Sequence, residues 1–219
     1  IGNSRWHWAI RYRNNWEFAH TSSKDQNLNL LKIPLLAWAS VGLIPKYINL
    51  EESIEITIKD IPIKNLPTWI GIDRALAALG AIKRSQSIGI NKNGILVVDA
   101  GTVLSITRVK SNYEFGGGQL IGGIKLQIEA MAKGAQNLYK PVIKDCPKET
   151  FPLGTSEAMI RGSFNALVSL IIEAQEKTNS PVWICGGDAP VLLDELQNRG
   201  VDITHFPNLV LEGLISLRH

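Results

Sequence analysis

The sequence predicts an α/β fold made of two similar halves. Segments of strand character alternate with segments of helical spacing along the chain, which is the pattern of an α/β protein. A weak internal repeat predicts the two halves, because the stretch that begins at Gly2 resembles the stretch that begins at Gly101. We place the halves at residues 1–95 and 96–219 and expect each glycine turn to face a cleft between them.

The first half contains two expected strands and one expected helix. Apolar runs at 34–41 and 54–58 have strand character. Residues 73–84 are rich in alanine and leucine and close with basic residues, which predicts a helix.

The second half opens with a strand, a turn and a strand over residues 97–109, "VVDAGTVLSITRV". Helices are expected at 124–138, 156–177 and from Asp188, as the cap, to Asn198, with Gly200 after the end. A short strand at 181–185 precedes Gly186, and one more strand and a short helix follow Val201. The apolar stripe of the long helix contains Met159, Ile160, Phe164, Leu167, Val168 and Ile171.

Composition excludes several classes of protein. The 219 residues are 45% hydrophobic and 20% charged, enough to build a core for one large domain or two compact halves. A net charge of +3 with scattered lysines and arginines does not indicate nucleic acid as a partner. We find no apolar run of about 18 residues and no signal peptide, so we expect a cytoplasmic protein without a membrane partner. Cys146 and Cys185 lie too far from any other Cys or His to match a zinc-binding pattern. We expect both to be reduced thiols.

A lone carboxylate, Asp99, ends the apolar strand before Gly101 and Thr102. In the repeat, Gly2, Asn3 and Ser4 fall where Gly101, Thr102 and Val103 fall. By this register the counterpart of Asp99 would lie one position before Ile1, so we expect the sequence to begin inside a motif and the first strand to be truncated.

Two strand-turn-strand units of this kind suit phosphate chemistry. Glycine lets the backbone approach a phosphate, the N–H and hydroxyl groups donate to its oxygens, and the carboxylate holds a cation against that charge. The alternative is a plain hairpin turn in which Asp99 accepts backbone hydrogen bonds.

Six segments together resemble the type III pantothenate kinases of the acetate kinase, sugar kinase, Hsp70 and actin superfamily. "IGNS" and "VVDAGT" resemble the two phosphate motifs, and "GIDR" is similar to the G-x-D-R substrate motif. "FGGGQLIGG", "TSEAMIRG" and "WICGGDA" resemble a glycine-rich segment, a T-x-x-[AS]-x-x-x-G segment and a glycine turn near adenosine. The six follow the family's order over nearly the whole chain.

The resemblance implies a duplicated actin-like, ribonuclease H-like fold and the ATP-dependent conversion of pantothenate to 4′-phosphopantothenate, which opens coenzyme A synthesis. It also implies Mg²⁺, a monovalent cation (K⁺ or NH₄⁺) and a homodimer. Residue by residue, the proton acceptor falls on Asp73 and the cation ligand on Asp99. Substrate binding falls on Gly71, Ile72, Asp73 and Arg74, with Thr155 reaching across the dimer interface. ATP binding falls on Gly2, Asn3, Ser4, Arg5, Thr102, Gly186 and Gly187.

The residue types agree with these roles, although simpler readings exist. Asp73 lies in the first turn of a predicted helix, where the dipole favours its ionised form, but it would also serve as an N-cap. Arg74 offers a planar fork to a substrate carboxylate or joins a surface ion pair. Thr155 is expected to cap its helix in either case. The apolar stripe of that helix predicts a dimer interface, with packing inside its own chain as the alternative.

The sequence departs from the family's pattern at four positions. Trp69 stands where an acid is usual, Lys64 where an aromatic is usual, Gly122 where a proline is usual and Cys185 where a threonine is usual. These changes affect fine substrate and adenosine contacts. Two alternatives to the kinase stay open: a catalytically impaired regulatory or binding protein on the same scaffold, and a sugar or acetate kinase-type phosphotransferase.

Overall fold

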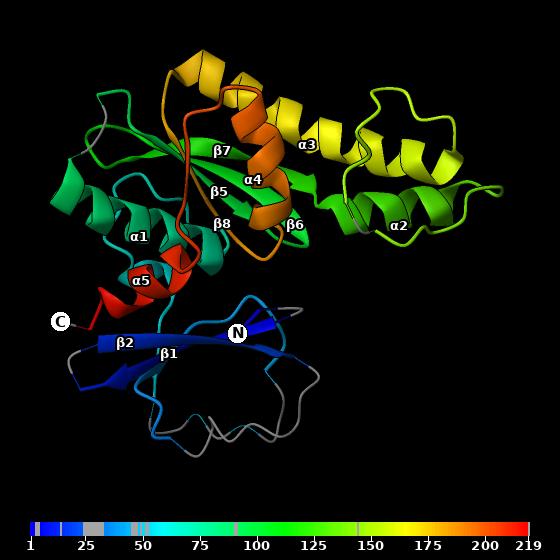
Figure 1. Cartoon of the computed structure of the whole chain (residues 1–219). Helices are drawn as coiled ribbons and strands as arrows, with labels where there is room; N and C mark the ends of the chain where they lie inside the picture. Colours follow the sequence, from blue (N-terminus) through cyan, green and yellow to red (C-terminus); the bar gives the residue numbers. More distant parts are fainter. Residues whose placement is uncertain are drawn as a thin grey trace. The chain divides into compact units, whose positions relative to one another are not determined.

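The computed structural model forms two compact units (Figure 1). It describes residues 1–2, 5–13, 15–23, 33–44, 48, 50, 53–89, 92–143 and 145–218. Unit one consists of Ile1–Gly89, Tyr113–Phe115 and Asn208–His219, and unit two consists of Ile90–Asn112 and Gly116–Pro207. The chain therefore returns to unit one at its end. The predicted division at residue 95 and the predicted cleft stay predictions.

Unit one contains a hairpin, a pair of short strands and two packed helices. Strands β1 (Arg5–Tyr12) and β2 (Asn15–Ser22) pair antiparallel, and β3 (Ala37–Trp38) pairs parallel with β4 (Ile54–Glu55). A 3₁₀ turn, Ile58–Asp60, precedes α1 (Ile72–Ile88). Helix α5 (Leu209–Ile215) lies beside α1 (Figure 1).

The strands predicted at 34–41 and 54–58 are present but only two residues long each. Local turn chemistry explains part of the shortening. The Ser40 hydroxyl donates to the Gly42 carbonyl at 2.7 Å and accepts from the Gly42 N–H at 3.2 Å. A serine that bonds its own neighbourhood competes with the strand ladder.

Unit two is a five-stranded sheet with helices packed on it. The strands β5 (Ile95–Ala100), β6 (Val103–Val109), β7 (Phe115–Gly122), β8 (Val182–Cys185) and β9 (Ile203–His205) stand in the order β7-β6-β5-β8-β9. β5 pairs antiparallel with β6 and parallel with β8, and β8 pairs parallel with β9. The helices are α2 (Ile124–Gly134), α3 (Thr155–Thr178) and α4 (Ala189–Asn198). β5 is a central strand and almost continuously buried, as expected for a parallel pairing covered on both faces.

The apolar stripe of α3 packs inside its own chain. Phe164, Leu167, Val168 and Ile171 are at most 2% exposed and join one core with the sheet residues Leu96 and Val98 and with α4. The stripe therefore cannot form a dimer interface, and the prediction based on its length was wrong. The reason is that the wide sheet of unit two, with α4, requires this cover from α3.

Candidate functional site

The residues predicted to bind phosphate lie at the C-terminal end of the central strand β5 and in the turn that follows it. We call this end of the sheet its edge. Asp99 is half-buried and lies opposite Ser105 on β6 and Cys185 on β8. Only two residues, Gly101 and Thr102, connect β5 to β6, so the turn is tight. The central strand thus carries a carboxylate at its next-to-last position and leads into a glycine turn, as the sequence predicts.

The turn after β8 packs against the turn after β5. Gly186 has φ +93°, and a Cβ added to it would overlap Asp99 Oδ1 and the Ala100 carbonyl oxygen. The backbone N–H of Asp188 donates to the Ala100 carbonyl at 2.8 Å. Parallel strands β5 and β8 end side by side, so Asp99 and Gly186 meet at the same edge of the sheet.

The end of the glycine-rich segment, at Gly123, also packs against the turn after β5. The Gly123 N–H donates to the Thr102 carbonyl at 2.9 Å, and a Cβ on Gly123 would overlap the Gly101 carbonyl oxygen. Helix α2 begins directly after Gly123, and α4 begins directly after Asp188. The N-termini of α2 and α4 therefore both lie beside the turn after β5. The positive ends of two helix dipoles favour a bound anion there.

Asp188 is the N-cap residue of α4, as predicted, but its side chain makes no capping hydrogen bond. Its contribution to the site is the backbone N–H that holds the Ala100 carbonyl. Sequence patterns do not reveal such a backbone contact, so the sequence predicts only a cap at Asp188.

The predicted substrate residues begin α1 in unit one. Gly71 is the N-cap residue, and Asp73 Oδ1 accepts the Arg74 backbone N–H at 2.8 Å. A Cβ on Gly71 would lie 2.5 Å from that oxygen, so a glycine leaves room for the carboxylate. The alternative reading of Asp73 as the N-cap is wrong, because Gly71 takes that place.

Arg74 is buried, with 9% of its surface exposed. Burial lowers the pKa of its guanidinium, while the neighbouring Asp73 carboxylate opposes that shift. A surface ion pair therefore does not describe Arg74. Its position next to Asp73 places a cation and a carboxylate together at the start of α1.

The first phosphate motif is described only in part. Asn3 and Ser4 lie outside the described residues. The Gly2 N–H donates to the Arg5 carbonyl at 3.1 Å, and Arg5 is exposed. The Ile1 carbonyl accepts the Val41 N–H at 3.1 Å, much as the Ala100 carbonyl accepts the Asp188 N–H. The Ile1 and Ala100 carbonyls thus each accept one backbone hydrogen bond, and the internal repeat stays a prediction.

Thr155 is the first residue of α3 and is exposed. The predicted capping role was wrong, because Gly154 is the N-cap residue. A Cβ on Gly154 would overlap Glu157 Oε2, so the Glu157 carboxylate folds back over the helix start and occupies the space that a capping side chain would need.

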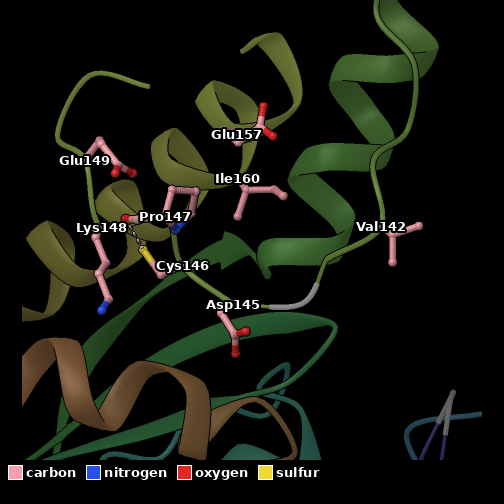
Figure 2. Close-up of a pocket in the computed structure, with 8 residues that line it drawn as sticks. All are labelled: Val142, Asp145, Cys146, Pro147, Lys148, Glu149, Glu157 and Ile160. Carbon is pink, nitrogen blue, oxygen red and sulfur yellow. Dashed lines mark hydrogen bonds between the residues drawn. The ribbon is translucent and has the colours of Figure 1, made fainter. Parts of the chain in front are cut away.

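A pocket of about 450 Å³ opens between the α2–α3 segment and α3 (Figure 2). It is lined by Val142, Asp145, Cys146, Pro147, Lys148, Glu149, Glu157 and Ile160. The Arg161 guanidinium donates to the Cys146 thiol at 3.2 Å and also pairs with Glu195 at 3.4 Å. The pocket contains none of the predicted site residues, so we do not assign it to the phosphate site.

Neither a cluster of three or more metal-ligating side chains nor a membrane-spanning helix is found among the residues that the structure describes. Within them, no group of three or more His, Cys, Asp or Glu side chains is placed to hold a metal ion. The helices that the structure describes include none with the length and apolarity needed to cross a bilayer.

Solved structures confirm the class of the fold. A conserved Baf family protein from Campylobacter jejuni superposes with a TM-score of 0.65 at 17% identity, covering 99% of this chain and 94% of that one. The ADPNP-bound activator of 2-hydroxyisocaproyl-CoA dehydratase from Clostridium difficile superposes with a TM-score of 0.51 at 9% identity. The match covers 100% of this chain and 92% of that one. At such identities the likeness concerns the fold alone, and it confirms the mixed α/β, actin-like class predicted from the sequence.

Sequence comparison defines the family within that class. The type III pantothenate kinase family model matches residues 45–177. A type III pantothenate kinase from Thermosynechococcus vestitus is 30% identical over 100% of this chain and 88% of its own length. A type III pantothenate kinase from Nostoc is 28% identical over 99% of this chain and 92% of its own length. The chain belongs to the type III pantothenate kinase family.

Proposed function

We propose that this chain transfers the γ-phosphoryl group of ATP to pantothenate and forms 4′-phosphopantothenate in the first step of coenzyme A synthesis. The observation that carries the proposal is its membership of the family, over the whole chain. The contacts that bring Asp99, Gly101, Gly123 and Gly186 together at the ends of β5 and β8 support the proposal. As a biosynthetic enzyme that uses ATP, it would act in the cytoplasm.

The phosphates of ATP would bind at the edge formed by the β5 and β8 turns. Gly186 and Gly187 carry no side chain that would shield their backbone N–H groups, and Thr102 supplies a hydroxyl. The starts of α2 and α4 would add favourable dipoles to a polyanion. The family resemblance assigns the Gly2 to Arg5 motif to ATP as well.

A cation at Asp99 fits the donors present. Asp99 Oδ1 and the Ala100 carbonyl oxygen both lie against Gly186, and hard cations take carboxylate, carbonyl and water oxygens. Asp99 would hold a monovalent cation, K⁺ or NH₄⁺, and Mg²⁺ would accompany the nucleotide. When bound, these cations neutralise the charge that develops on the transferred group.

Asp99→Asn tests the cation assignment. The amide keeps the size and an acceptor oxygen but loses the negative charge. We expect the rate of the variant to become insensitive to added K⁺ or NH₄⁺, in contrast to the unaltered enzyme, measured as ADP release at constant ionic strength with Na⁺ as replacement. A cation response equal to that of the unaltered enzyme would overturn the assignment.

Asp73 would accept the proton of the pantothenate hydroxyl. A carboxylate suffices as the base because the proton leaves late, when the oxygen is already bonding to phosphorus. Asp73 lies in the first turn of α1, and Arg74 would offer two N–H groups to the substrate carboxylate. Trp69, 79% exposed on the preceding loop, stands where the family usually has an acid and so alters the rim of this site.

The direct experiment is a coupled assay of ADP release. With ATP and Mg²⁺ present, release should depend on pantothenate, and mass spectrometry should find 4′-phosphopantothenate. Acetate and common sugars serve as controls for the related phosphotransferases. ADP release that no acceptor changes, or that acetate or a sugar raises instead, would overturn the proposed function.

The working unit would be a homodimer whose contact lies at the segment before α3. Four large apolar side chains there are strongly exposed in the single chain: Tyr139, Val142, Phe151 and Leu153, from 79% to 106%. Such a concentration of exposed apolar surface is typical of an interface. Thr155 follows Leu153 by two positions and would then reach the partner's substrate, as the family resemblance implies.

A further inference from the structure

Two histidine rings face each other across the β1–β2 hairpin. His7 and His20 are directly paired in the register of the two strands. Their Nδ1 atoms are 2.7 Å apart, and the ring centroids are 4.9 Å apart with the planes at 70°. Both residues keep exposed surface, although the His7 ring is partly desolvated. The phosphate motif at Gly2 does not involve these rings.

The 2.7 Å contact requires that at least one of the two Nδ1 atoms carries a free lone pair, and such a lone pair is what binds a metal ion. Burial of the ring and the charges of His20, the chain start and Arg5 lower the pKa of His7 to about 4. A neutral His7 ring has one lone pair and one N–H, so at 2.7 Å one Nδ1 donates to the other. Moving the donated proton to Nε2 of its own ring frees both Nδ1 lone pairs without net proton loss.

We propose that His7 and His20 form a surface site for a divalent first-row transition ion that prefers imidazole, such as Cu²⁺ or Zn²⁺. Each Nδ1 would supply one bond, and water would fill the other positions. With metal–nitrogen bonds of about 2.0–2.1 Å, two ligands on a tetrahedral ion lie roughly 3.3 Å apart. The rings therefore need to separate by only about 0.6 Å from the observed 2.7 Å. This inference does not depend on the kinase activity.

The surroundings set the strength of the site. Alternation along β1 places Arg5 and Arg11 on the same face as His7, and the residues opposite them on β2 are Ser22 and Trp16. These neighbours add no carboxylate, and the two arginines oppose a cation. We therefore expect modest affinity, with Cu²⁺ bound more tightly than Zn²⁺ because that order holds for nitrogen sites in general.

Protein without a histidine tag should be titrated with Zn²⁺ by calorimetry and with Cu²⁺ by electron paramagnetic resonance. We expect one ion per chain and nitrogen hyperfine structure in the Cu²⁺ spectrum. His7→Asn and His20→Asn should each weaken binding on the order of tenfold or more, since each removes one of two ligands. His205→Asn removes another described histidine from β9 and serves as the matched control, with no change expected.

A measurement on the unaltered protein covers the case in which a hairpin variant misfolds. Histidine ring resonances in NMR spectra should show Zn²⁺ shifting the signals of His7 and His20 together, while that of His205 stays in place. The site is overturned if Zn²⁺ and Cu²⁺ do not bind saturably, if the shifts belong to other histidines, or if folded His7→Asn and His20→Asn proteins bind as well as the unaltered protein.

Discussion

The carboxylate of Asp73 has two distinguishable tasks at the start of α1. One is local, because Oδ1 accepts the Arg74 N–H at 2.8 Å and helps to begin the helix. The other is the proposed acceptance of the substrate proton. An asparagine in its place retains an acceptor oxygen of the same shape but is not a base, so one substitution separates the two tasks.

We expect Asp73→Asn to lower kcat by about 10²-fold or more, because general-base catalysis typically contributes this much. The KM for pantothenate should change less, and the unfolding temperature should stay close to that of the unaltered protein. Steady-state kinetics and thermal unfolding give the two readouts. Near-normal turnover would return Asp73 to a purely structural role.

Gly186 is the residue where the two turns of unit two leave no room for a side chain. Gly186→Ala places a methyl group against Asp99 Oδ1 and the Ala100 carbonyl at φ +93°, so the turn must move. We expect about 1–3 kcal/mol of lost stability and weaker ATP binding, measured by chemical unfolding and nucleotide titration.

Gly200 provides the matched control for Gly186. It also has a positive φ, +76°, but a Cβ there would meet no atom within 4 Å. Gly200→Ala should show only the backbone cost, about 1 kcal/mol, and leave ATP binding unchanged. Equal effects of the two substitutions on ATP binding would show that the contact with Asp99 does not shape the site.

At the scale of single residues, the sequence predicts which residues belong to the site and the order of their motifs, but not how those residues touch one another. Asp99, Gly101 and Gly186 were identified because their motifs follow one another in the family's order. The overlap between Gly186 and Asp99 could not be predicted, since it depends on the parallel pairing of β5 with β8. His7 and His20 shared no motif, and only the register of the hairpin brings their rings together.

Helices α1 and α5 pack through reciprocal glycines. A Cβ on Gly80 would overlap the Leu209 carbonyl, and a Cβ on Gly213 would overlap the Leu76 carbonyl. The backbones therefore approach more closely than any side chain allows. Arg84 and Glu212 add a bidentate ion pair between the same helices, at 2.9 Å and 2.6 Å.

Gly80→Ala should lower the free energy of unfolding by about 1–3 kcal/mol, because forcing the two helices apart costs more than the alanine gains in helix propensity. Gly162→Ala is the matched control, since Gly162 lies within α3 with nothing within 4 Å of the added Cβ. The control should gain about 0.5–1 kcal/mol. Urea unfolding of both variants measures the difference, and a stabilised Gly80→Ala protein would contradict the close packing.

At the scale of elements, the helical patterns were the most informative. The helix predicted at 73–84 extends from Ile72 to Ile88, and that predicted at 156–177 spans Thr155–Thr178. The helix predicted at 124–138 ends earlier, at Gly134. The sequence could not show what covers the α3 stripe, because an apolar helix face is the same pattern whether its own sheet or a partner lies against it.

The whole molecule raises the question of how the exposed apolar side chains before α3 are covered. In the single chain Phe151 and Leu153 are 88% and 106% exposed, which leaves them available to a partner. Phe164 is only 2% exposed, so a charge there would disrupt the core and say nothing about assembly. The exposed pair therefore gives the sharper test of the proposed dimer.

Phe151→Asp or Leu153→Asp should leave the chain folded, because neither side chain is in the core, and should weaken the dimer. Removing one buried apolar side chain from an interface costs about 1.5–3 kcal/mol, or roughly 10- to 100-fold in the dimer dissociation constant. Leu43→Asp, at an apolar residue of unit one that is 96% exposed, is the control and should not change assembly. Sedimentation measures the oligomeric state and ADP release measures activity. If Thr155 completes the partner's site, the KM for pantothenate should rise as the subunits separate, whereas a fully active monomer would show that each chain contains its whole site.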